Sequence, residues 1–311
     1  MNKKEKKKEE EKEKAFQKKD WKANRKRLHA EQMREEKKIM AKARKKIRSR
    51  CAGLKVDLTG ILTAAADDDG NISFKGMKAK ADAALIAETN RKISIYNRTN
   101  PERPMQGLPG TATRADVAEA AAGLALRGLA MDLQADIGPH IGRTAVRAYT
   151  ETYMLFEHGM FDQMQPYLAE TTERWAKEQE SVVYKTLENS ADRTGEKLRR
   201  ILKDGYVRGI SYENLVDESV KKIAGLEETG AYMITYTEGT RVMAEASAKA
   251  VMDKGYKKYR LSTVGDDKVC PRCEALESQT FDFKDREAGV NWPPLHPMCR
   301  CTFYVIEDKD E

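Results

Sequence analysis

The sequence predicts a mainly α-helical protein with a basic helical arm at the N-terminus, an elongated helical body and a small β-rich module near the C-terminus. Charged residues make up 34% of the 311 residues and hydrophobic residues 40%, a balance that favours long exposed helices over one compact globule. Helical patterns dominate as far as Gly255, and short β-like runs follow. Four of the five cysteines lie in this last part, between residues 270 and 301.

Residues 1–50 form the predicted arm. They hold 22 Lys/Arg and 9 Asp/Glu, a formal charge of +13, whereas the remaining residues carry −6. The segment contains no Gly or Pro, and most of its residues favour helix. Trp21 to Leu28 is one heptad step and Met33, Met40 and Ile47 continue the pattern. The phase shifts between residues 28 and 33, so the coiled-coil pattern is incomplete.

The charge of this arm suits phosphate backbones or an acidic protein surface. Contact with double-stranded DNA would be non-specific, because the arm has no base-reading motif and no interleaved aromatic residues. A solvated helix that contacts nothing in particular is the alternative. The candidate nucleic-acid-binding residues are Lys22, Arg25, Lys26, Arg27, Arg44, Lys45, Lys46 and Arg48.

Residues 51–110 are a predicted mixed connector. "DDDGNISF" has the composition of a turn followed by a short extended piece. Residues 75–98 have the pattern of one helix, and "NPERPMQGLPG" is a linker rich in Pro and Gly.

Residues 111–255 form the predicted helical body. Thr113 and Asp116 have the spacing of an N-cap and an acidic N3 residue. We expect the first helix to end at about Ile137, because "GPHIG" interrupts it, and the second to begin near Arg143. A third helix over 167–189 and shorter ones after it are expected, with Gly residues closing several of them.

Residues 256–306 form the predicted module. "YKKYRLSTV" alternates like a strand, and "QTFDF" and "CTFYVI" are short aromatic or β-branched runs. A piece of about 50 residues cannot bury enough apolar surface to fold alone. The module therefore needs either a surface to dock on or an internal staple.

The cysteines provide a possible staple. The spacing is Cys270-x2-Cys273 and, further on, His296-x2-Cys299-x-Cys301. A Cys-x2-Cys turn presents two thiolates to one edge of a tetrahedral ion, and a second pair of donors completes a structural Zn²⁺ site. Our first choice of ligands is Cys270, Cys273, His296 and Cys299, with Cys301 in place of His296 or Cys299 as the alternative. The predicted fold class is thus mainly α with a zinc-stapled module.

Other interpretations of the cysteines are reduced thiols packed as small hydrophobes, or a disulfide. Cys51 stands alone in the basic segment and is interpreted as a free thiol. A catalytic role would need a Cys270–His296 nucleophile pair, or an open zinc site with Asp266 or Asp267 as general base. A site of nearly all sulfur donors is closed and unreactive, so we expect a structural zinc and no enzymatic activity.

The apolar stretches of the sequence are too short for a membrane span, which needs roughly 20 apolar residues. The best candidate, "VAEAAAGLALRGLAMDL", contains Glu119, Arg127 and Asp132 and reads as a packed helix. The charged N-terminus lacks the apolar region of a signal peptide. We expect no membrane partner and a reducing cytoplasm, where clustered cysteines bind metal more often than they form disulfides.

The order of motifs in residues 190–305 is specific. A helix carries Thr237, Glu238 and Arg241, a strand follows Gly255, and "CPRC", "LESQTF" and "PLHPMCRC" come after it. This combination resembles the phage minor head, or head-morphogenesis, proteins, the Mu protein F-like group. The resemblance implies a structural component of a virion or procapsid, made in the cytoplasm of a bacterial host or from a prophage.

As partners the resemblance implies a portal protein and capsid or scaffold proteins, with roles in head assembly and in DNA packaging or ejection. The basic arm would then reach packaged double-stranded DNA or an acidic portal surface. Arg272 and Arg300 are either phosphate or carboxylate contacts or solvated side chains. Two other classes stay open: a zinc-ribbon nucleic-acid-binding protein, and a toxin-like enzyme such as an ADP-ribosyltransferase, for which Glu238 and Arg241 are the candidate residues.

Overall fold

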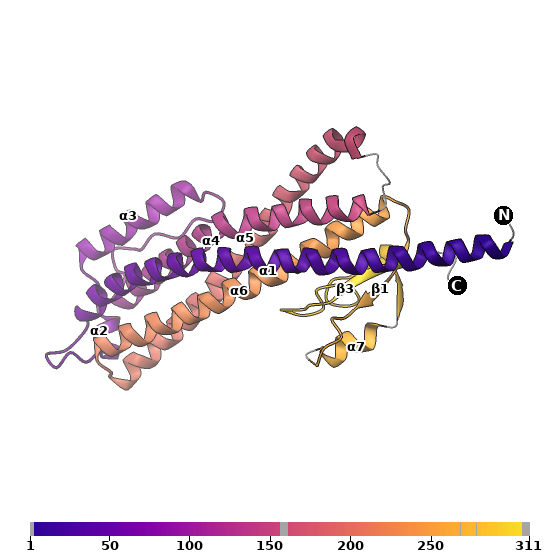
Figure 1. Cartoon of the computed structure of the whole chain (residues 1–311). Helices are drawn as coiled ribbons and strands as arrows, with labels where there is room; N and C mark the ends of the chain where they lie inside the picture. Colours follow the sequence, from indigo (N-terminus) through magenta and orange to yellow (C-terminus); the bar gives the residue numbers. More distant parts are fainter. Residues whose placement is uncertain (1–2, 156–160, 268, 278, 307–311) are drawn as a thin grey trace. The chain divides into compact units, whose positions relative to one another are not determined.

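The computed structural model describes residues 3–155, 161–267, 269–277 and 279–306, and of these it gives residues 3–20, 22 and 161–172 as backbone only. The described chain is mainly helical, as predicted, with a small antiparallel sheet near the C-terminus (Figure 1). In chain order the elements are α1 (Lys3–Thr63), α2 (Phe74–Lys78), α3 (Ala83–Thr99), α4 (Arg114–Met154), α5 (Phe161–Arg208), α6 (Tyr212–Met252), β1 (Lys258–Ser262), α7 (Pro271–Glu277), β2 (Thr280–Asp282), the 3₁₀ turn η1 (Phe283–Asp285) and β3 (Thr302–Ile306).

The chain forms two compact units, each built from separated segments. Unit 1 comprises Met1–Ile39, Ile137–Val183 and Met233–Glu311, and unit 2 comprises Met40–Asp136 and Tyr184–Tyr232. The helices α1, α4, α5 and α6 each contribute to both units. The arm boundary expected at residue 50 lies inside α1, and the expected arm contributes residues to both units.

The long helices are more continuous than the sequence predicts. The break expected at "GPHIG" is wrong, because α4 runs through Pro139 without ending. Proline costs an interior helix about 3 kcal/mol, since it removes one N–H and crowds the preceding turn. Ile137 and Ile141 on either side are fully buried, so packing outweighs this local preference. In the same way α5 and α6 each form one helix where two shorter ones were expected.

The connector departs from the prediction in one place. Residues 75–98 do not form one helix, since α2 and α3 are separate. The residues between them pair with the segment before α4: the Ala81 N–H donates to the Ala112 carbonyl (2.9 Å), and Lys80 forms a bridge with Thr113. These long-range hydrogen bonds compete with helix continuation.

Unit 2 has its core along one face of α1. Buried residues follow a 3–4 spacing through Ile47, Cys51, Leu54, Leu58 and Ile61. Cys51 is a free thiol, as expected, but it lies in this core, and burial raises its pKa to about 11. Met40, Ala43 and Ile47 of the predicted arm are also buried, so the interpretation in which the arm contacts nothing is wrong for these residues.

The C-terminal sheet belongs to unit 1. Its strand order is β2-β1-β3, all antiparallel, with Tyr259 of β1 opposite Phe281 and Val305. All three strands fall in the runs that the sequence predicts. Tyr259 and Leu261 alternate along β1 and are fully buried.

The sheet packs on helices and does not form an isolated module. Its core joins aromatic residues of the module to Ala244, Ala248 and Val251 of α6 and to Trp21 of α1. Trp21 is 5% exposed, so the N-terminal half of α1 also has a buried face. The predicted need for a docking surface is met by these helices. Within the described residues, no helix is both long enough and apolar enough to cross a membrane.

Candidate metal centre

The Cys-x2-Cys turn lies at the N-terminus of α7. Cys270 directly precedes the helix and Cys273 lies in its first turn. The Cys273 N–H points at the sulfur of Cys270 (3.4 Å), and the two sulfurs are 3.3 Å apart. That separation is far beyond a disulfide bond, and all five cysteines are free thiols, so the disulfide interpretation is wrong.

The second half of the cluster is a tight turn. The Cys299 N–H donates to the His296 carbonyl (3.1 Å), and Met298 between them has a positive φ of 61°. The Met298 N–H donates to the hydroxyl of Thr237 on α6 (3.2 Å). The turn is thereby fixed to the helix that supports the module.

His296 has the orientation of a metal ligand. Its Nε2 lies 3.4 Å from the Cys270 sulfur and 3.3 Å from the Cys273 sulfur. Its Nδ1 lies 2.8 Å from the Pro297 carbonyl oxygen, a contact that requires Nδ1 to carry the proton and donate it. Nε2 then has a free lone pair directed at the two sulfurs, as in zinc-binding histidines.

Cys273 also belongs to a second group of donors. Its sulfur and those of Cys299 and Cys301 all lie within 4.8 Å of one another. Cys270, Cys273 and His296 form the other group of this kind. The structure thus brings all five predicted donors into one cluster, and Cys299 and Cys301 both compete for the fourth position beside His296.

The thiols differ in how readily they ionise. The hydrogen bond from Cys301 lowers the pKa of Cys299 to about 5, and the Cys273 N–H lowers the pKa of Cys270. Burial raises the pKa of Cys273 to about 12, and the hydrogen bond to Cys299 raises the pKa of Cys301. A bound cation would stabilise the thiolate form of these cysteines, so the protonated thiols would release their protons when they bind it.

The donor set fits a tetrahedral ion of zinc type. Zinc prefers thiolate and imidazole donors, and a Zn–S distance of about 2.3 Å places neighbouring sulfurs about 3.8 Å apart. The sulfurs of Cys270 and Cys273 are 3.3 Å apart, somewhat closer than this value, and His296 Nε2 lies 3.3 and 3.4 Å from the same two sulfurs. Cys273 and Cys299 are 2% and 0% exposed, so four protein donors would leave little room for substrate or water.

The charged residues near the cluster are engaged by protein groups. Arg300 makes a bidentate ion pair with Asp266 (2.6 and 2.7 Å), and Arg272 donates to the Gly289 carbonyl. These contacts lie within the chain, so the predicted phosphate or carboxylate contacts of Arg300 and Arg272 with a partner stay predictions. Asp266 is not a free general base, whereas Asp267 is exposed.

The two enzyme candidates on α6 pair with each other. Glu238 accepts from Arg241 (2.7 Å, i,i+3), and Arg241 also donates to Gln179 (2.9 Å). This arrangement is that of charges holding helix faces together.

The structure corrects one predicted nucleic-acid contact. Arg25 is 6% exposed, and its guanidinium donates to the hydroxyls of Ser247 and Thr152 and covers the Trp21 ring at 4.6 Å. Burial lowers its pKa to about 9. Arg25 is thus a core residue and cannot reach a phosphate.

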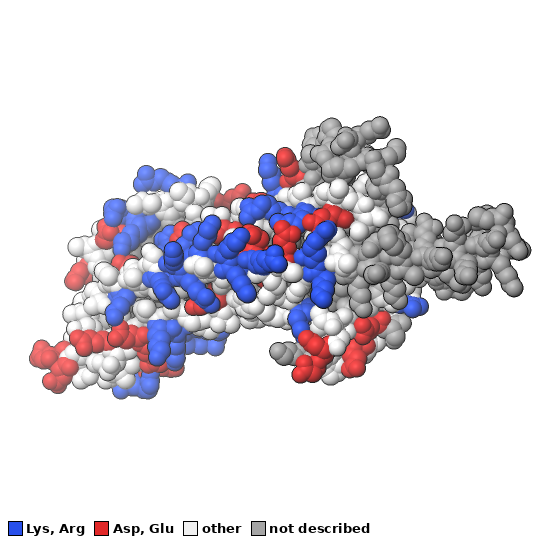
Figure 2. Space-filling model, in the orientation of Figure 1, with Lys and Arg blue, Asp and Glu red and all other residues white. Residues whose placement is uncertain are grey.

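The other basic candidates fall into two groups. Arg27 pairs with Glu151 (2.9 Å), Arg44 with Glu228, and Lys46 with Asp136 (2.6 Å). Lys26, Lys45 and Arg48 are exposed, and no ion pair is found for them within the described part of the chain. The side chain of Lys22 lies outside the described residues. Figure 2 shows Lys and Arg gathered along α1 on the viewed face.

Sequence reasoning named two supporting residues without predicting their roles. Trp21 completes the core of the module, and its signal was a large aromatic residue in a helix that is otherwise highly charged. Thr237 positions the His296–Cys299 turn, and only the family resemblance pointed to it.

Fold and cluster together define a mainly helical protein with a small C-terminal module, docked on its helices, whose Cys/His cluster could hold a metal ion. Residues 196–304 match the family model of Phage Mu protein F like protein, which confirms the resemblance noted above. The match covers roughly a third of the chain and includes the end of α5, all of α6 and the module as far as Tyr304 in β3. It indicates a protein related to phage heads and associated with virions. No curated protein and no solved structure matches the chain.

Proposed function

We propose that this protein is a phage minor head protein that acts in head morphogenesis as a structural and interaction component, without enzymatic activity. The observation that carries the proposal is the position of the Cys/His cluster. It lies inside the segment that matches the Mu protein F-like family, and its sulfurs are part of the core that joins β1 and β3 to α6 and α1.

A structural role for the metal follows from the donor set. Three cysteines and one histidine would complete a tetrahedral zinc site and leave no open position for a substrate. Asp266 is held by Arg300, and Glu238 is held by Arg241, so these groups are occupied in ion pairs. Both features support a staple more than a catalytic centre.

The partners we propose are the portal protein of the same phage, together with capsid or scaffold proteins, in the procapsid and the virion. The test is co-expression with that portal protein, followed by affinity purification through the portal and sedimentation of the complex. Stoichiometric recovery is expected. Failure of the full-length, zinc-loaded chain to bind either portal or procapsid would remove the proposed role.

Association with double-stranded DNA is a second candidate function. The exposed Lys26, Lys45 and Arg48 on α1 favour it, because they have no carboxylate partner within the described residues. Binding through such residues is non-specific and weakens steeply with salt. DNA retention on a filter at two salt concentrations tests this function independently of portal binding.

A further inference from the structure

Unit 2 contains an apolar pocket with cations at its mouth. It has a volume of about 250 Å³ and lies between α2, α4 and α5. Its walls are apolar: Phe74 and Met77 come from α2, and Leu202 and Tyr206 from α5. Lys78, Lys203 and Arg199 line it as well, and Glu119 is its one acidic lining residue.

The half-exposed Phe74 is held in this position by the structure around it. Phe74 is 53% exposed, whereas Met77 in the same short helix is 1% exposed and anchors α2 in the core. Ser73 caps the helix by accepting from the Gly76 N–H (2.9 Å). Gly76 leaves no space for a side chain beside the Ala65 carbonyl, so α2 sits close against the end of α1. Aromatic side chains are enriched in the centre of protein interfaces, so an exposed Phe beside an apolar pocket is a candidate contact for a partner.

The pocket has an excess of positive charge. Arg199 is neutralised by Glu119 (3.1 Å), and the nearby Asp116 accepts two hydrogen bonds from Thr113. The charge of Lys78 also acts on Asp116, so Lys203 is the cation with the least compensation. Lys78 lies 5.9 Å from the Phe74 ring, and Lys203 is exposed on α5. No ion pair to either lysine is found in the part of the chain that the structure describes. Carboxylates are therefore the complementary groups.

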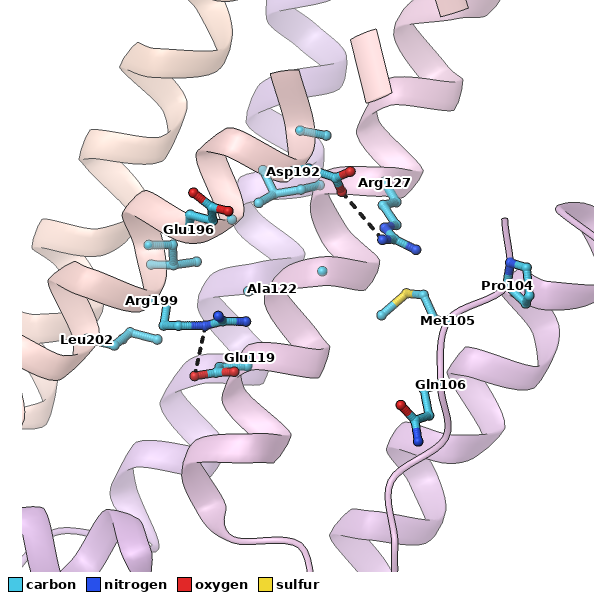
Figure 3. A pocket seen from close by; sticks show the side chains of 15 residues that line it. Pro104, Met105, Gln106, Glu119, Ala122, Arg127, Asp192, Glu196, Arg199 and Leu202 are labelled. Atoms are coloured by element: carbon cyan, nitrogen blue, oxygen red, sulfur yellow. Dashed lines mark ion pairs between the residues drawn. The ribbon is translucent and has the colours of Figure 1, made fainter. Parts of the chain in front are cut away.

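The pocket continues into a larger depression. A neighbouring cavity of about 460 Å³ shares Glu119, Arg199 and Leu202 with it. Figure 3 shows Arg199 and Glu119 facing each other across α5 and α4, with the side chain of Met105 directed toward Ala122. The larger cavity is also lined by Asp192, Glu196 and Arg127, so the excess of positive charge belongs to the smaller pocket, where an acidic segment would bind.

We infer that this groove binds a partner protein through a segment with one large apolar side chain flanked by carboxylates. The apolar side chain would fill the pocket between Phe74 and Tyr206, and the carboxylates would meet Lys78 and Lys203. The inference goes beyond the proposed function, because it depends neither on metal binding nor on DNA binding, and Phe74, Lys78 and Glu119 lie outside the family match.

The experiment uses the full chain and a set of fluorescent twelve-residue peptides. Each peptide has a single Leu, Met, Phe or Trp between glutamates, and control peptides have Lys for Glu or Ala for the apolar residue. Fluorescence anisotropy should show saturable binding of at least one acidic peptide and none of either control. No saturable binding by any acidic peptide, or equal binding of the Lys-containing controls, overturns the inference.

Variants assign the binding to this groove. Phe74→Ala and Lys203→Glu should each weaken binding about tenfold or more. Val56→Ala and Lys197→Glu are the matched controls, because Val56 is 72% exposed on α1 and Lys197 is exposed on α5, both outside the pocket. Equal losses in the control variants contradict the site. If the chain self-associates and Phe74→Ala abolishes this self-association, the occupant of the groove is a second copy of the chain. This outcome also contradicts the inference.

Discussion

The indole N–H of Trp21 donates a hydrogen bond to the carbonyl oxygen of Phe303 at 2.7 Å, across 282 positions of sequence. The two rings are also in contact, with their centroids 5.4 Å apart. Phe303 in turn packs against Tyr259, Phe283 and Trp292. The N-terminal helix is therefore part of the core of the C-terminal module.

Replacing Trp21 tests this relationship. Trp21→Ala should destabilise the protein by about 3–5 kcal/mol, because it leaves a cavity among aromatic side chains. Trp21→Phe should cost about 1–2 kcal/mol, because it keeps most of the ring contact and leaves the Phe303 carbonyl unpaired. Denaturation curves followed by circular dichroism measure both values. Equal stability of Trp21→Ala and the wild type would show that α1 does not support the module.

Metal removal tests the proposal that a bound zinc ion stabilises the C-terminal module. The purified chain should contain one zinc ion, measured by elemental analysis, and chelation should unfold the module while the helices of unit 2 stay folded. Proteolysis should then cleave within residues 258–306. Cys270→Ser should reproduce the loss of zinc, whereas Cys51→Ala should keep full zinc content, since Cys51 lies in unit 2. A metal-free chain with a protected module would contradict the staple.

Cobalt substitution distinguishes Cys299 from Cys301. Each thiolate bound to Co²⁺ adds intensity to the charge-transfer absorption, so the spectrum counts sulfur ligands. If Cys299 is the fourth ligand, Cys299→Ser should lose one thiolate and Cys301→Ser should leave the spectrum unchanged. The reverse result would assign Cys301, and a loss in both variants would show that His296 is the spare donor.

Glu36 should make stability depend on pH. Its side chain is 1% exposed, and burial raises its pKa to about 7, with Gln32 donating to it at 2.7 Å. Because the folded pKa is raised, the stabilisation is complete below the unfolded pKa of about 4.5 and is lost as pH rises through about 7. Glu36→Gln should therefore be more stable than the wild type at pH 8 by roughly 2–3 kcal/mol, and by much less at pH 5.

The comparison needs a control at a neighbouring position. Glu35 accepts from Lys38, which lowers its pKa, so Glu35 is charged in both states between pH 5 and 8. Glu35→Gln should leave the pH profile unchanged. Burial lowers the pKa of His140 to about 4, and this contribution is the same in the wild type and in Glu36→Gln. The charge of Glu35 raises the pKa of His140, so Glu35→Gln lowers that pKa further, below the pH range compared. An unchanged difference between Glu36→Gln and the wild type across this pH range would contradict the assignment.

DNA binding should depend on the unpaired basic residues of α1. The double variant Lys45→Glu, Arg48→Glu should lower the salt dependence of DNA affinity by about two units of slope, one for each lost phosphate contact. Lys185→Glu with Lys197→Glu changes the net charge equally on α5 and is the control. Anisotropy of a labelled duplex at several salt concentrations measures the slope. Deletion of residues 1–50 is a poor test, because it also removes Trp21 from the core.

The sequence predicted the elements whose signals are local. The three strands followed from alternation and β-branched runs, and the metal cluster followed from the spacing of Cys270, Cys273, His296 and Cys299. The continuity of α4 through Pro139 did not follow from local signals, because the burial of Ile137 and Ile141 depends on distant segments.

Local sequence patterns also could not predict which basic residues of α1 are buried and which are exposed. Arg25 and Lys26 are adjacent and chemically similar, yet one is buried and the other is exposed. In a helix that is charged on nearly all sides, sequence alone does not reveal which face meets a partner helix. The hydroxyls of Thr152 and Ser247, which bind Arg25, lie more than a hundred positions away.

The hydrogen bond between Trp21 and Phe303 can form only late in translation, because the two residues lie far apart in the sequence. At the usual 5–20 residues per second, a ribosome makes Phe303 roughly 15–60 s after Trp21. During that interval the indole of Trp21 has neither its hydrogen-bond acceptor nor its aromatic neighbours. The growing chain therefore exposes a tryptophan to solvent in a segment that is rich in lysine. Newly made protein thus passes through a period in which chaperones can bind this helix, and that period ends only when the last strand has been translated.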